Sequence, residues 1–194
     1  MRWSALAPLG LLVVQACSSS AAVSARLQAT LAEMPEDSPA RLWLEGDRIA
    51  AAAVATGPGS LPQAVRTAVE AVEPGGETVF QGREWGARGE GYRVDKHYVL
   101  AGQDHRRTAL VAADGRVLER GHSVPIAEVP QAVLAAALDV GPTVVEAMIV
   151  SGPEVEEFWR CEVTDRLGRS YVVTVGLDGG RRGVVRRVAA TVGV

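Results

Sequence analysis

The sequence predicts an α+β protein built from two tandem repeats, each with one helix packed on a four-stranded antiparallel meander. Two observations predict this fold. The tetrapeptide Pro-Gln-Ala-Val occurs at 62–65 and again at 130–133. Asp-Gly pairs, which favour tight turns, follow at 114–115 and 178–179. Self-similarity of this kind indicates a duplicated structural unit, and two such units can pair edge to edge into one continuous sheet.

The first residues have the pattern of an export signal. The uncharged run from Ala5 to Ala16 is shorter than the about 20 apolar residues that a membrane-spanning helix needs. It ends in Val14-Gln15-Ala16-Cys17, which resembles a bacterial lipobox. We expect residues 1–16 to be a lipoprotein signal peptide and Cys17 to be lipidated, which would place the protein on the outer membrane, facing the periplasm, if the cell has two membranes. An ordinary secretory signal cleaved after Ala16 is the alternative.

The rest of the chain divides by composition and periodicity. Residues 17–40 are small, polar and proline-bearing, as expected of a tether. Residues 41–124 are expected to form the first unit, with a hairpin around Gly46-Asp47 that adds strands to one sheet edge, and residues 125–194 the second. The expected helices are 61–72 and 128–140, and the expected strands are 78–83, 91–100, 106–113, 116–122, 143–150, 157–163, 169–176 and 182–189.

The two helices show an apolar face and a start signal. Ser60 is a candidate N-cap, and Pro62 falls in the first turn, where a missing N–H is tolerated. Apolar residues recur at helical spacing, so we expect Val65 and Val133 to be buried under their sheets.

Alternation along the strands predicts which side chains share a face. On the 92–100 strand, Tyr92, Val94, Tyr98 and Leu100 should face the helix. The opposite face then collects Arg93, Asp95 and His97 from the first unit and Phe158, Arg160 and Glu162 from the second.

Trp85 lies in a polar, glycine-rich segment. It can be an exposed interface anchor or can fold back over the helix. We expect a partner to dock on the helix-free face, with contacts that include Trp85, Arg93, His97, Phe158 and Arg160.

These elements resemble the PepSY-like family of exported bacterial proteins. The resemblance is carried by Leu61-Pro62-x-Ala64-Val65, Tyr92-x-Val94 and Asp114-Gly115, and in the second unit by Val129-Pro130-x-Ala132-Val133, Trp159-x-Cys161 and Asp178-Gly179. It implies a fold like that of the beta-lactamase inhibitor protein, whose exposed sheet face grips a partner, and it transfers no catalytic residue.

Composition and motifs exclude several kinds of chemistry. The formal net charge is -3, and becomes -4 without residues 1–16, which hold one arginine and no acid. This acidity argues against nucleic acid binding, which calls for a basic patch. The histidines lack metal-site spacing, and we predict no cofactor. Cys161 is expected to be a buried, unreactive thiol. Asp95 near His97 could form a hydrolase dyad, but a strand face is the simpler interpretation.

Three functions therefore remain. The leading hypothesis is a non-enzymatic, lipid-anchored envelope protein that binds another protein, such as an inhibitor of a secreted or periplasmic enzyme. The second is a small-ligand carrier or sensor, and the third is a hydrolase that uses Asp95 and His97. A pocket lined by converging polar groups would favour the carrier or the enzyme, whereas a broad face with exposed aromatic side chains would favour protein binding.

Overall fold

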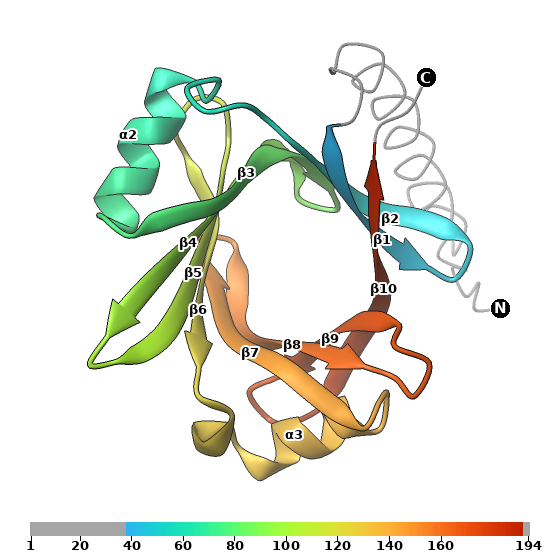
Figure 1. Ribbon diagram of the computed structural model, residues 1–194. Coiled ribbons are helices and arrows are strands. Elements are labelled where there is room, and N and C mark those ends of the chain that lie inside the picture. Colours follow the sequence, from blue (N-terminus) through green and yellow to red (C-terminus); the bar gives the residue numbers. More distant parts are fainter. Residues whose placement is uncertain (1–37, 192–194) are drawn as a thin grey trace, which may run out of the picture.

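Ten antiparallel strands close into a barrel in the computed structural model, which describes residues 38–191 (Figure 1). The elements are β1 (Pro39–Glu45), β2 (Arg48–Ala55), α2 (Gln63–Val72), β3 (Glu77–Gly86), β4 (Gly89–Leu100), β5 (Gln103–Val111), β6 (Val117–Val124), η1 (Ile126–Glu128), α3 (Gln131–Leu138), β7 (Thr143–Gly152), β8 (Val155–Thr164), β9 (Ser170–Gly176) and β10 (Arg181–Thr191). Both α-helices lie outside the barrel wall (Figure 1). The signal segment 1–16 and Cys17 lie outside the described residues.

The predicted fold class of two helix-on-meander repeats is wrong. The hairpin of β1 and β2 was expected to extend one sheet edge, but it pairs with β10 on one side and with β3 on the other. The strand order is β1-β10-β9-β8-β7-β6-β5-β4-β3-β2. Closure removes the unpaired edges that an open sheet would expose. It also turns the helix-free face into the inner wall of a barrel.

The helices begin directly after a proline in both cases. Pro62 and Pro130 occupy the N-cap positions of α2 and α3, and neither helix has a side-chain cap. Ser60, the expected cap, instead donates its hydroxyl to the carbonyl of Gly57 at 2.6 Å. The fixed φ of proline suits the position that precedes a helix.

Each Asp-Gly pair forms a tight turn beneath a helix. Gly115 and Gly179 have φ of 92° and 81°, which glycine adopts without strain. A Cβ at Gly115 would lie 3.1 Å from the carbonyl oxygen of Ala64, and one at Gly179 would lie 2.7 Å from Cβ of Ala132. The turns therefore hold each helix close to its strands.

Two apolar cores fill the space between the helices and the outer wall. Val65 and Val133 are fully buried, as predicted. Trp159, Cys161 and Val163 pack against α3, also as expected from alternation. Cys161 is buried, and its burial raises its pKa to about 11, so the thiol stays protonated at neutral pH.

Val133→Asp should lower the free energy of unfolding by several kcal/mol, because it places an unpaired charge in the core under α3. The matched control is Ala135→Asp on the exposed side of the same helix. Thermal or urea unfolding measures both. Equal stability of the two variants would contradict the packing of α3.

Candidate functional site

The inner wall of the barrel is lined by charged side chains. Arg93 and Asp95 of β4 alternate with Val94, which packs under α2 on the outside. Arg160 of β8 likewise alternates with the outward Trp159 and Cys161. The predicted sharing of one face by Arg93 and Arg160 is correct, but that face encloses a lumen and is not an open surface.

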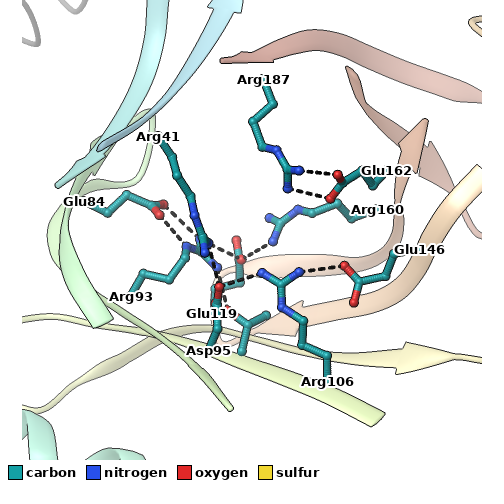
Figure 2. Close-up of polar contacts among 11 residues, drawn as sticks. Arg41, Glu84, Arg93, Asp95, Arg106, Glu119, Glu146, Arg160, Glu162 and Arg187 are labelled. Atoms are coloured by element: carbon teal, nitrogen blue, oxygen red, sulfur yellow. Dashed lines mark hydrogen bonds and ion pairs between the residues drawn. The ribbon is translucent and has the colours of Figure 1, made fainter. Parts of the chain in front are cut away.

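The charged side chains form two groups: the inner layer is built around Arg93, and the outer layer is built around Asp95. The side chain of Arg93 is 8% exposed. Its guanidinium donates to Thr108 Oγ1 at 2.8 Å, to Glu84 Oε1 at 2.9 Å and to Glu119 Oε1 at 3.2 Å. Glu119, which is 2% exposed, also pairs with Arg160 at 2.8 Å and with Arg88. Figure 2 shows how Arg93 and Arg160 approach Glu119.

Asp95 is the centre of the outer layer. Its Oδ2 accepts from Arg41 Nη1 at 2.7 Å and from Arg106 Nη2 at 2.6 Å. Arg106 also donates through Nη1 to Glu146 Oε2 at 2.9 Å. One arginine therefore bridges two carboxylates from β4 and β7 (Figure 2).

A separate pair completes this layer. Arg187 of β10 donates through both terminal nitrogens to the two oxygens of Glu162 on β8. This fork is the strong geometry for an arginine and a carboxylate. In Figure 2 it lies beside Arg160, and it links β10 to β8 inside the barrel.

The protonation of the buried acids follows from these partners. Burial alone would raise the pKa of Asp95, but Arg106, Arg93 and Arg41 outweigh it and lower that pKa to about 2. Glu119 follows the same balance, and its pKa is also about 2. Burial raises the pKa of Glu146, with repulsion from Glu162 and Asp95, against the attraction of Arg106.

Apolar side chains occupy part of the inner wall of the barrel. Met148, Val150 and Phe158 form a buried cluster on the inner wall. The guanidinium of Arg88 lies 5.4 Å from the centroid of the Phe158 ring, and that of Arg160 lies 5.7 Å from it. Phe158 is therefore part of an internal apolar cluster, whereas it was predicted to contact a partner.

One end of the barrel opens through a cavity of about 850 Å³. Its floor includes Arg41, Arg106 and Arg187. An inner cavity of about 260 Å³ continues into the lumen and shares these three arginines in its lining. The rim carries the exposed apolar side chains of Val79, Ile126 and Val145, which are 52%, 37% and 56% exposed.

His97 lies at this open end. Its Nε2 is 3.0 Å from Asp104 Oδ1, and it lines the cavity together with His105. The predicted dyad of Asp95 and His97 does not form, because Asp95 is held by arginines. His97 is thus the predicted contact residue that the structure places at an accessible opening.

Trp85 occupies neither of its two predicted positions. It is 2% exposed and packs with Ala40 and Val54 of the neighbouring strands. The guanidinium of Arg83 lies 5.4 Å from its ring. Trp85 is therefore part of a core, and it is unavailable as an exposed anchor in the described part of the chain.

Several residues of the lumen were missed by sequence reasoning. They are Arg41, Glu84, Arg88, Arg106, Glu119, Glu146 and Arg187. A usable signal existed, because acids and arginines both recur on the side of the strands opposite the apolar positions. An open solvated face explains that pattern equally well until the sheet is known to close.

The outer layer presents three arginines to the opening, in a cavity lining that also includes Asp104, Glu146 and Glu162. The side chains of Arg41, Arg106 and Arg187 are 27–29% exposed. The acids paired with them are more covered: Asp95 is 1% exposed, Glu162 is 15% exposed and Glu146 is 21% exposed. A solute that enters the cavity therefore meets guanidinium groups that are more exposed than the carboxylates they pair with.

Neither a cluster of metal-binding side chains nor a membrane-spanning helix occurs within residues 38–191. No group of three or more histidine, cysteine, aspartate or glutamate side chains there is arranged to hold a metal ion. No helix in that range has the length and apolar character needed to cross a membrane.

Comparison with known proteins gives a limited result. No family model matches the sequence. No curated protein matches it either. Among solved structures, a Bacteroides eggerthii protein that has been assigned to the periplasm is similar, with 19% identity and a TM-score of 0.48 over 66% of this chain and 90% of that chain. A DUF2874 family protein from Bacteroides uniformis is similar with 19% identity and a TM-score of 0.44, over 66% of this chain and 88% of that one.

The buried carboxylates should make the protein sensitive to acid. Because the pKa values of Asp95 and Glu119 are lower in the folded protein than in the unfolded chain, their stabilisation is present above about pH 4.5 and lost as the pH falls toward about 2. Glu146, with its raised pKa, acts in the opposite direction and offsets part of the loss. Urea unfolding between pH 6 and pH 2.5 measures the effect.

Glu119→Gln should be less stable than the wild type at neutral pH by about 3–5 kcal/mol, because three arginines lose their shared acid. It should also lose less stability on acidification. Glu157→Gln, on an exposed position of β8, is the control. An unchanged pH profile in Glu119→Gln would show that the network does not govern acid unfolding.

Proposed function

We propose that this chain is a non-catalytic binding protein of the bacterial envelope, and that it takes a small amphipathic anion at the open end of its barrel. The observation that carries this proposal is the arrangement of Arg41, Arg106 and Arg187 at the floor of the 850 Å³ cavity. Pockets of several hundred Å³ with a few convergent polar groups are the usual form of small-molecule sites.

The charge and the apolar rim together favour this class of ligand. An anionic group would meet the guanidinium groups, which bind carboxylates through charge-assisted hydrogen bonds. An apolar tail would lie against Val79, Ile126 and Val145, whose exposure at one opening is unfavourable in water. Each methylene that the rim covers would contribute about 0.8 kcal/mol.

A protein partner is the second candidate, and the same rim favours it. Exposed apolar side chains around an opening also suit the contact of a protein segment. The predicted anchor at Cys17 belongs to either proposal, since a lipid on that residue would hold the barrel at a membrane surface.

Hexanoate and octanoate are suitable probes of the cavity. Isothermal titration should show binding of both, with octanoate tighter by up to about tenfold, since two extra methylenes are partly buried. Arg187→Gln should weaken binding of both at least tenfold. Arg186→Gln is the matched control, because Arg186 is the exposed neighbour on β10. Hexylammonium, with the same tail and the opposite charge, should not bind.

Absence of binding for both carboxylates would remove the small-anion proposal. Equal binding of hexanoate by the Arg187→Gln and wild-type proteins would place the anion elsewhere. A search for envelope proteins captured by the full chain then becomes the test of the second candidate.

The anchor has its own test. Cys17→Ser should move the protein from the membrane fraction to the soluble fraction, because the acyl acceptor is lost. Cys161→Ser is the control, because that thiol is buried in the core. Unchanged fractionation of Cys17→Ser would contradict the lipoprotein prediction.

A further inference from the structure

Two buried polar atoms of the lumen have no hydrogen-bond partner among the described residues. They are Oδ1 of Asp95 and Nε of Arg106. The two atoms belong to one ion pair, since Arg106 Nη2 donates to the other carboxylate oxygen of Asp95 at 2.6 Å. Asp95 itself is 1% exposed. A buried group left without a partner costs about 1–3 kcal/mol, and here two such groups lie in the same pair.

The two atoms require opposite hydrogen-bond partners: one needs a donor and the other needs an acceptor. The pKa of Asp95 is held at about 2, so its carboxylate is ionised at neutral pH and Oδ1 can only accept a hydrogen bond. Nε of Arg106 can only donate. A bound group that satisfies both must offer a donor and an acceptor at neighbouring atoms.

Both atoms belong to residues that line the cavities. Asp95 lines the inner cavity of about 260 Å³. Arg106 lines that cavity and also the outer one that opens at the rim. A ligand head that passes the arginines of the floor would therefore approach the side chains of Asp95 and Arg106.

We propose that the ligand is a carboxylate with a hydroxyl or amine on the adjacent carbon, in which this substituent donates to Asp95 Oδ1 and a carboxylate oxygen accepts from Arg106 Nε. This inference rests on the anion site proposed above and names its substrate class. The tail of the ligand extends toward the rim at Val79, Ile126 and Val145.

Simpler ligands satisfy only part of the site. A plain carboxylate accepts from Arg106 but leaves Asp95 Oδ1 unpaired and adds a like charge beside it. A neutral diol could pair with both atoms but would bring no additional negative charge to the guanidinium groups of Arg41, Arg106 and Arg187. A substituted carboxylate combines the two contacts, and its amine form adds attraction between an ammonium group and the ionised Asp95.

Four six-carbon probes separate these cases on the intact soluble chain: hexanoate, 2-hydroxyhexanoate, 2-aminohexanoate and 1,2-hexanediol. Titration calorimetry should show one or both of the substituted acids binding at least tenfold more tightly than hexanoate, and the diol more weakly than either. The stronger of the two acids identifies whether the site takes hydroxy acids or amino acids. Enantiomers of that acid should differ in affinity, because carboxylate, donor and tail meet three different parts of the site.

Asp95→Asn should reduce the preference over hexanoate to less than threefold, while hexanoate itself binds at least as well as before, since a like charge is gone. Asp104→Asn, on a side chain that is 82% exposed at the same opening, should keep the preference. Because the wild-type series decides the question alone, failure of Asp95→Asn to fold does not affect it.

The possible failures differ between the two proposals. If no carboxylate binds, the anion site itself is refuted. If hexanoate binds as tightly as both substituted acids, the anion site stands and the Asp95 contact is refuted, with a buried water as the partner of the two atoms. If the diol binds as tightly as the substituted acids, the ligand is a neutral polyol and the proposed class is wrong.

Discussion

The barrel depends on the pairing of charges inside it. Among residues 38–191, six arginines of the lumen meet five carboxylates, and the arginines are Arg41, Arg88, Arg93, Arg106, Arg160 and Arg187. An unpaired ion at such a depth would cost several kcal/mol. Some pairs join strands that are not neighbours in the sheet, such as Arg41 of β1 with Asp95 of β4 and Glu119 of β6 with Arg160 of β8. These pairs can form only when the sheet curves around the lumen, so the curvature of the barrel and this part of the charge pairing depend on each other.

In a network with only a structural role, every buried polar atom is expected to have a hydrogen-bond partner within the network. The inner layer nearly meets this expectation. Arg93 reaches two carboxylates and one hydroxyl. The outer layer is different, because it is partly exposed and keeps two unpaired atoms. This contrast within one lumen is the reason for proposing the ligand site in the outer layer and a supporting role for the inner layer.

Local sequence signals predicted local structure, and the closure depends on a pairing that such signals do not contain. Strand alternation placed Arg93 and Arg160 on one face and Val133 in a core. The pairing of β1 with β10 joins opposite ends of the described chain, and nothing in residues 41–55 specifies both neighbours of the hairpin. If the sheet is not known to close, the sequence indicates that the charged face is a solvated surface. It likewise allows Trp85, beside a glycine-rich turn, to be exposed. Both interpretations failed for the same reason, since each assumed solvent where the barrel places its wall or its lumen.

The count of charges also bears on what the lumen can bind. Six arginines and five carboxylates leave one positive charge in excess when all are ionised. A monovalent anion at the outer layer would complete the balance, whereas a cation would double the excess. Binding of this kind stabilises the folded state by mass action, by about 2.7 kcal/mol at a ligand concentration of 100 times Kd. The charge balance inside the barrel would therefore also favour an anion over a cation in the proposed site.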